Sequence, residues 1–216
     1  VILTKNAGPS FRQTLTQIYR QQVDWAFEVV VVDSGSTDET LEIVKDFPVR
    51  KVEIPPNEFN FGLTRNYACL LSQGEHIATL SQDAVPCDDQ WLQNLIRPFF
   101  LNPNVVAVQG TERKPEDRRI FYWERRGAFY FTSETRRWKE RYTHGLSFVN
   151  CAVQKAFWAS HPIPYTPFSE DKLFQTRIHS AGREIVVAQA AGCVHGHQYT
   201  FFSLVRRLYG EGAGWK

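Results

Sequence analysis

Acidic side chains stand at three places where the sequence pattern ends a strand or opens a helix. Asp33 and Asp83 each follow a short apolar run, and the pair Glu170 and Asp171 begins a helical pattern. A carboxylate can accept hydrogen bonds from a ligand, ligate a hard cation, or take a proton from a hydroxyl group. The sequence therefore carries groups suited to ligand binding, metal binding and general base catalysis.

The segment around Asp33 has the pattern of a nucleotide-binding turn. The β-branched run 29–32 is typical of a strand buried on both faces of a parallel sheet. Ser36 and Glu39 have the spacing of a capping box, and Asp38 falls in the first turn of the helix that follows. Carboxylate and free backbone amides then meet at the carboxyl edge of the sheet, where open α/β sheets bind ligands, most commonly nucleotides. Taken alone, the segment also fits a generic nucleotide binder.

Alternating strands and helices must position these groups. Strands are predicted at 1–4, around 29–32, and at 49–54, 76–80 and 105–108. The spacing of apolar residues predicts helices at about 11–19, 41–47, 63–72 and 91–99. Repeated βα units over residues 1 to about 110 imply an α/β fold of three layers, a mostly parallel sheet with helices on both faces.

The second half of the chain has a different character. Residues 111–145 are rich in arginine and aromatic residues and show no clear strand pattern. Sheet-like sequence returns from Ser147, and a helix is predicted from Ser169 to the glycine at 182. The strand 184–188 and the stretch 193–197 are expected to close the core.

The composition is that of an ordinary globular protein. The 216 residues are 43% apolar and 22% charged, and the formal net charge of +2 is below the basic excess usual in nucleic-acid binders. The four cysteines form no C-x-x-C pair, which favours reduced thiols in a cytoplasmic protein over zinc, redox or disulfide chemistry. No apolar run approaches the roughly 20 residues that span a bilayer. Because the chain begins within a predicted strand and holds no methionine, we expect it to be trimmed.

Four segments, in order along nearly the whole chain, resemble the motifs of one enzyme family. Residues 31–38 match V-V-D-x-G-S-x-D, and 61–66 resembles the family's glycine segment that ends in arginine-asparagine. Residues 81–84 stand where the family carries its aspartate-x-aspartate metal motif, and 169–171 supplies the glutamate-aspartate pair. The chain thus resembles the inverting glycosyltransferases of family 2. Within this family its motifs most resemble those of the polysaccharide rhamnosyltransferase branch, which has threonine-glutamine-aspartate-alanine at the metal motif.

The resemblance implies a GT-A-like (Rossmann-like) fold in a single domain. Residues 1–110 would form the nucleotide-sugar-binding half, and 111–216 the acceptor-binding and catalytic half. The implied reaction moves a sugar, with inversion at the anomeric carbon, from a nucleoside diphosphate to a hydroxyl of a glycan or lipid-linked acceptor. The later motifs, with the run His195-x-His197-x-Tyr199, look most like the branch that uses dTDP-rhamnose. A thymidine or uridine diphosphate deoxysugar is therefore expected in preference to a GDP-linked sugar.

The same resemblance assigns roles to individual residues. Donor binding falls to Thr4, Asn6, Asp33, Ser34, Arg65, Gln82 and Asp83. Within this set Asp33 would bind the base or ribose, and Arg65 the phosphates, since a guanidinium can grip phosphate oxygens bidentately. Asp171 would be the general base, and Glu170 a catalytic neighbour that holds the acceptor.

A divalent cation, Mg²⁺ or Mn²⁺, is expected beside the diphosphate, because these ions prefer carboxylate and phosphate oxygens. Asp83 would be a ligand, with Ser81 in place of the first acid of the family's motif. In the family a histidine after the last core strand completes the site, and His195 is favoured over His197. Two histidines could also serve zinc, but no cysteine or further histidine lies at a useful spacing. A structural role stays open for either one.

The stretch 118–138 interleaves arginines with aromatic residues, Trp123 among them. Such a mixture suits a sugar acceptor platform near a membrane surface, an amphipathic helix packed on the core or on a partner, or a single-stranded nucleic-acid site. Because the rest of the chain points to sugar transfer, we expect Trp123 to contact the acceptor. Peripheral contact with the inner face of a membrane is the associated expectation, and a nucleic-acid partner is not expected.

Two alternatives stay open from the sequence. A sugar-phosphate nucleotidyltransferase shares the sheet, but that class typically opens with a glycine-rich loop and a basic residue after the first strand. This chain has Lys5-Asn6-Ala7-Gly8-Pro9 there. The second alternative is a carbohydrate or nucleic-acid binding module without turnover.

Overall fold

The computed structural model describes residues 1–113, 115, 145–166, 169–196, 202, 205 and 209. Its strands are β1 (Ile2–Thr4), β2 (Val29–Asp33), β3 (Val49–Glu53), β4 (His76–Leu80), β5 (Ala84–Pro86), β6 (Val105–Arg113), β7 (Asn150–Gln154) and β8 (Glu184–His195). Its helices are α1 (Phe11–Tyr19), α2 (Thr40–Lys45), the 3₁₀ turn η1 (Pro56–Glu58), α3 (Phe61–Leu71), α4 (Trp91–Leu101), α7 (Lys155–Ser160) and α8 (Glu170–Ser180).

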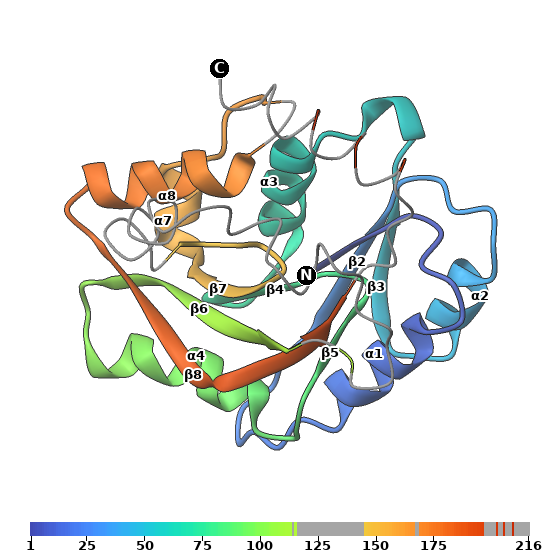
Figure 1. Cartoon of the computed structure of the whole chain (residues 1–216), viewed down its shortest axis with the longest axis horizontal. Coiled ribbons are helices and arrows are strands. Elements are labelled where there is room, and N and C mark those ends of the chain that lie inside the picture. The colour runs from blue at the N-terminus through green and yellow to red at the C-terminus, as the bar shows by residue number, and fades with distance from the viewer. Residues whose placement is uncertain are drawn as a thin grey trace.

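The strands form one continuous layer (Figure 1). One sheet has the order β1-β2-β3, and the other has the order β4-β7-β6-β8-β5. Two backbone hydrogen bonds join β1 to β4: Leu80 N–H to the Val1 oxygen at 3.2 Å, and the Val1 nitrogen to the Ala78 oxygen at 2.7 Å. This is the bonding pattern of a parallel pair. The carboxyl ends of β1, β2 and β4 therefore meet at one edge.

Six of the eight strands in the described part of the chain run in one direction, which confirms a mostly parallel sheet. The pairs β1–β2, β2–β3 and β6–β8 are parallel. The exceptions are β7, antiparallel to both β4 and β6, and the short β5, antiparallel to β8. Of these two, β5 lies inside residues 1–110 and interrupts the βα repeat predicted there, whereas β7 belongs to the later sheet-like sequence. Hydrophobic alternation identifies a strand but carries no information about its direction.

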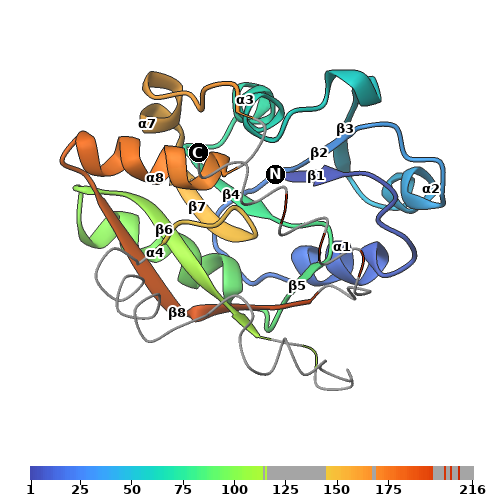
Figure 2. The same cartoon turned by 45° about the horizontal axis from the view of Figure 1, so that its top comes forward.

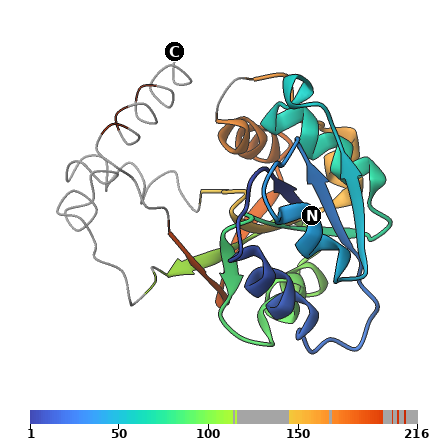
Figure 3. The same ribbon diagram turned by 90° about the vertical axis from the view of Figure 1, so that its right-hand side faces the viewer.

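Helices cover both faces of the sheet, as expected. Val29 and Val31 of β2 face a core shared with α1, α2 and α4, whereas Val30 and Val32 face the opposite side, toward α3. Farther along that opposite side, α7 and α8 bury large side chains against the sheet. Figures 2 and 3 show the same two helix layers with the sheet between them. The predicted three-layer α/β architecture is therefore confirmed.

Two strands are longer than predicted. β6 continues to Arg113 rather than ending near 108, and β8 runs unbroken from Glu184 to His195 in place of two separate segments. The added residues are mostly polar or small, so they show no hydrophobic pattern. They pair with one another instead, as in the register of Thr111 with Gly192. Among the described residues, no helix is long and apolar enough to cross a membrane.

Candidate active site

A cavity of about 420 Å³ lies at the edge where β1, β2 and β4 end. Residues predicted to bind the donor line it from several elements: Thr4, Ser34, Arg65, Gln82 and Asp83. Aromatic rings contribute the apolar walls, among them Phe61 and Phe148. A second cavity of about 360 Å³ lies near the start of β2 and contains none of the predicted site residues. The first cavity is therefore the candidate active site.

Asp33 lies under this cavity rather than in it. Its side chain is fully buried, and one carboxylate oxygen accepts the N–H groups of Gly35 and Ser36 at 2.9 and 2.8 Å. The other oxygen accepts the hydroxyls of Thr4 and Ser36. Three donors from the turn after β2 and the Thr4 hydroxyl of β1 thus bond to the carboxylate, and the predicted contact of Asp33 with base or ribose stays a prediction. Asp33 holds the turn that borders the cavity.

The loop after β1 and the loop after β2 are tied to each other by side chains. Asn6, with a left-handed φ of 49°, accepts the Thr37 N–H at 2.8 Å through its side-chain oxygen. Asp38 accepts the N–H groups of Gly8 and Thr40 at 2.9 and 3.0 Å, and its bonds to Thr40 lower the pKa of its carboxyl. Asn6 therefore supports the loops and is absent from the cavity wall.

The predicted capping box does not form. Helix α2 begins at Thr40, one residue after Glu39, and no side-chain capping bond is made at its start. The Ser36 hydroxyl instead bonds to Asp33, and its oxygen also accepts the Asn6 N–H. The stronger partner is the buried carboxylate, so the serine serves the turn and not the helix.

Arg65 connects the cavity to the predicted catalytic pair. Its side chain is only 13% exposed and lies 3.6 Å from the Glu170 carboxylate. The guanidinium carbon lies 4.8 Å from the centre of the Phe148 ring and 5.5 Å from that of Phe61. One terminal nitrogen, Nη1, is buried and has no hydrogen-bond partner among the residues that the structure describes. A buried donor without a partner is costly, so an anion in the cavity would satisfy it.

Glu170 and Asp171 occupy the first turn of α8, as predicted. The preceding Ser169 has a left-handed φ of 59°, which turns the chain sharply into the helix. Burial raises the pKa of Glu170, opposed by the charge of Arg65. Burial also raises the pKa of Asp171, opposed chiefly by Lys172. An ionised carboxylate with a raised pKa is a better proton acceptor than one at the surface.

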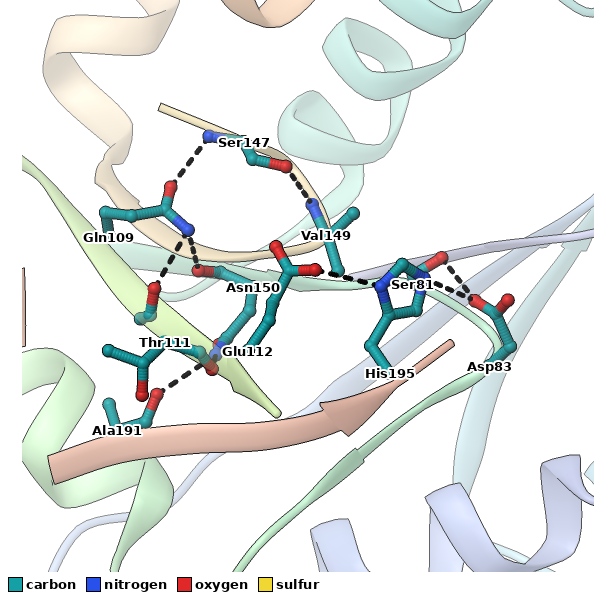
Figure 4. A network of polar contacts seen from close by, with 11 residues as sticks. Ser81, Asp83, Gln109, Thr111, Glu112, Ser147, Val149, Asn150, Ala191 and His195 are labelled. Atoms are coloured by element: carbon teal, nitrogen blue, oxygen red, sulfur yellow. Dashed lines mark hydrogen bonds and ion pairs between the residues drawn. The ribbon is translucent and has the colours of Figure 1, made fainter. Parts of the chain in front are cut away.

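Asp83, which lines the cavity, lies next to His195 (Figure 4), and the predicted metal binding of the two stays a prediction. His195 Nε2 lies 3.4 Å from Asp83 Oδ1, and Nδ1 lies 2.9 Å from Glu112 Oε2. Burial alone would lower the pKa of His195, but hydrogen bonds and charge from Asp83 and Glu112 outweigh it and raise the pKa to about 9. Ser81 donates a 2.7 Å hydrogen bond to Asp83.

Sequence reasoning missed Glu112, because the strand that carries it was expected to end four residues earlier. Its place comes from strand pairing, since Glu112 lies opposite Cys193, two residues before His195 on the neighbouring strand, and no local sequence pattern indicates that pairing. His197, Tyr199, Trp123 and the whole stretch 118–138 lie outside the described residues, so their predicted roles stay predictions.

The chain matches the model of glycosyl transferase family 2 over residues 1–159. It therefore belongs to this family, and the resemblance drawn from its motifs is confirmed. The protein is a glycosyltransferase with a GT-A fold, an enzyme that moves a sugar from a nucleotide-sugar donor. The nucleotidyltransferase and the non-catalytic module are set aside.

The chain is similar to two curated O-antigen chain rhamnosyltransferases. RfbN of Salmonella typhimurium is 26% identical over 223 residues, and WbaN of Salmonella anatum is 25% identical over 222. Each alignment covers 98% of this chain and 70% of the relative. Among solved structures, the mannosyltransferase PcManGT from Pyrobaculum calidifontis, in complex with GDP-Man and Mn²⁺, superposes with a TM-score of 0.70 at 23% identity. That match covers 95% of this chain and 58% of the other, and it bears on the fold alone.

Proposed function

We propose that the protein transfers a sugar, with inversion, from a nucleoside diphosphate to an acceptor hydroxyl, and that Asp171 is the general base. The observation that carries this proposal is the position of Arg65. Arg65 lines the donor cavity and lies 3.6 Å from Glu170, and its buried Nη1 has no hydrogen-bond partner within the described part of the chain. The Arg65 guanidinium thus lies between the cavity, where we place the diphosphate, and the Glu170 carboxylate.

The proposed roles follow from this arrangement. Arg65 binds phosphate oxygens and stabilises the negative charge that builds on the leaving diphosphate. Asp171 takes the proton of the acceptor hydroxyl as its oxygen attacks the anomeric carbon from the side opposite the leaving group. Glu170, paired with Arg65, holds the acceptor. Thr4, Ser34 and Gln82 border the donor, while Asp33 and Asn6 shape the loops beneath it.

Asp83 and His195 together fit a divalent cation of the Mg²⁺ or Mn²⁺ type. Asp83 offers a carboxylate and His195 an imidazole, side by side. No group of three or more acidic, histidine or cysteine side chains arranged to hold a metal occurs in the described ranges. The donor's phosphates must therefore supply much of the coordination, and the cation's contribution is to neutralise charge on the diphosphate.

We further propose a thymidine or uridine diphosphate deoxysugar, such as dTDP-rhamnose, as the donor. The similarity to two rhamnosyltransferases along almost the whole chain supports this, together with the residues 81–84. The acceptor is a growing glycan or a lipid-linked glycan, bound in part by Trp123. The enzyme then works in the cytoplasm, at the inner face of a membrane.

Nucleotide titrations test the donor and the cation together. Isothermal titration of dTDP, UDP and GDP into the protein with Mn²⁺ should give the tightest binding for dTDP or UDP. Tightest binding by GDP would remove the deoxysugar assignment and leave the glycosyltransferase intact.

The Asp83→Ala variant addresses the cation. In the parent protein EDTA should weaken dTDP binding about tenfold or more, since metal and nucleotide share coordination. Asp83→Ala should bind dTDP equally with Mn²⁺ and with EDTA, and Asn57→Ala, an exposed substitution, should behave like the parent. Equal nucleotide affinity with and without metal in the parent would refute the shared site.

A further inference from the structure

Glu112 contacts the His195 ring on the side opposite to Asp83. The imidazole is held between two carboxylates, with Nδ1 2.9 Å from Glu112 and Nε2 3.4 Å from Asp83. Figure 4 shows the three side chains in a row, with Ser81 beside Asp83. The contacts therefore run from Glu112 near the end of β6, through His195, to Asp83 in the cavity wall.

A shift in strand register brings Glu112 to this position. Gln109 on β6 lies opposite Val187 on β8, whereas Thr111 lies opposite Gly192, so β8 contains three additional residues between these pairs. The shifted register continues to Glu112 opposite Cys193. Since side chains alternate along a strand, Cys193 and His195 share a face, and Glu112 reaches the ring from the adjoining strand. Without the shift, Glu112 would lie three residues away along β8.

Asn150 of β7 holds the shift in place. Its side-chain amide donates 3.0 Å hydrogen bonds to the oxygens of Thr111 and Ala191, one on each strand at the irregularity. Its side-chain oxygen accepts the Trp91 indole N–H at 2.9 Å. A fully buried side chain thus fixes the two strands at the point where their register changes.

The contact between Glu112 and Nδ1 determines which tautomer of His195 is favoured. When Nδ1 carries the proton and donates it to Glu112, the lone pair of Nε2 points toward the side where Asp83 lies. A carboxylate on the second ring nitrogen of a ligating histidine fixes the tautomer and the ring orientation, and makes the ligand more basic. The Ser81 hydroxyl orients Asp83 in a similar way through its 2.7 Å hydrogen bond.

We propose that Glu112 is a positioning residue for the cation site, which sets the tautomer and orientation of His195 so that Nε2 acts together with Asp83. The proposal rests on the proposed cation site. Glu112 does not act as a third ligand: it contacts the opposite nitrogen of the ring, and no three such side chains in the described ranges are grouped around a metal position. The metal motif carries one acid, Asp83, with Ser81 in place of the other. Glu112 compensates for the missing acid by fixing the orientation of His195.

Two variants separate positioning from charge. Glu112→Gln loses the charge but keeps an oxygen that accepts the Nδ1 proton, whereas Glu112→Ala loses both. We expect Glu112→Ala to weaken Mn²⁺ binding 10- to 100-fold, measured with Mn²⁺ alone by electron paramagnetic resonance, and Glu112→Gln to stay within about fivefold of the parent. Glu53→Ala, an exposed glutamate at the end of β3, is the matched control and should bind as the parent does.

A second readout needs no metal. In the metal-free parent and in Glu112→Gln, proton NMR should show a downfield, slowly exchanging Nδ1 proton of His195, and Glu112→Ala should lack it. Unchanged Mn²⁺ affinity in Glu112→Ala, equal losses in both Glu112 variants, or absence of the resonance in the parent would each overturn the proposal. Failure of the cation site itself has a different signature, namely Mn²⁺ affinity that is unaffected by Asp83→Ala and His195→Ala.

Discussion

Burial decides how the carboxylates beside Arg65 can act. Glu170 and Asp171 both have raised pKa values because they are desolvated, and of these two carboxylates Glu170 is the one within ion-pair distance of Arg65, at 3.6 Å. The two neighbours in sequence therefore have different environments. Glu170 is paired with Arg65, and for Asp171 we propose the role of proton acceptor.

Asp171→Asn tests this division of roles. The change keeps size and polarity but removes the proton acceptor, so the turnover number should fall by about 10² or more, in line with general base contributions. Nucleotide affinity should change little, because Arg65 and the cation site are untouched. Glu42→Gln, on the exposed surface of α2, is the control. Near-normal turnover of Asp171→Asn would exclude it as the base.

His195 predicts a pH dependence of stability in the metal-free protein. Its pKa of about 9 in the folded protein lies above the reference value near 6.5. The protonated form is therefore favoured by folding, and the stabilisation is complete below pH 6.5 and is lost as pH rises to 9. In EDTA, the free energy of unfolding should fall by up to about 3 kcal/mol over this window.

The comparison variant is His195→Gln, which keeps a polar side chain without the titration. Chemical denaturation at pH 6 and pH 9 should show a markedly smaller decrease in this variant than in the parent. If both proteins lose the same free energy of unfolding, His195 is not the group responsible.

At the scale of elements, the site depends on where strands end and how they are aligned. The carboxyl ends of β1, β2 and β4 gather the donor residues, and the irregular pairing of β6 with β8 brings Glu112 to His195. Asn150 maintains that pairing from β7. Gly110 is needed at the same place, because a Cβ there would come within 2.3 Å of the Asn150 side chain.

Asn150→Ala should destabilise the fold by about 3 kcal/mol. It leaves the Trp91 N–H and the oxygens of Thr111 and Ala191 without their partner inside the protein, and buried unpaired groups cost about 1–3 kcal/mol each. Urea denaturation measures the change, and Asn57→Ala, which is exposed, should stay within about 0.5 kcal/mol of the parent. A loss below 1 kcal/mol for Asn150→Ala would show that the strands hold their register without it.

The elements that the sequence predicted well are those whose pattern is local. The run 29–32 predicts β2, and the apolar stripe of α4 predicts its buried face. The pairing of 109–113 with 189–195 is not local: it depends on bonds between strands about 80 residues apart. The same holds for Asp33, whose type and place were predicted, while its four hydrogen bonds come from Gly35, Ser36 and, across the sheet, Thr4 of β1.

At the scale of the whole molecule, the donor cavity and the catalytic pair come from different parts of the chain. Residues before 110 supply most of the cavity wall, and α8 supplies the carboxylates. β6 crosses the proposed boundary at residue 110 without interruption. The division into a donor half and an acceptor half stays a prediction. A strand shared by the two halves is what a single domain requires. Arg65 and His195 are the side chains that join them.

The stereochemical course of the reaction tests most directly whether an acceptor hydroxyl, deprotonated by Asp171, displaces the nucleoside diphosphate. The protein is incubated with dTDP-rhamnose, Mn²⁺ and a lipid-linked glycan acceptor, and the product is analysed by proton NMR while released nucleotide is identified. We expect dTDP in equal amount to a new glycosidic bond, whose anomeric configuration is opposite to that of the donor. A product with retained configuration, or release of pyrophosphate or a nucleoside monophosphate, would contradict direct displacement by an acceptor that Asp171 deprotonates.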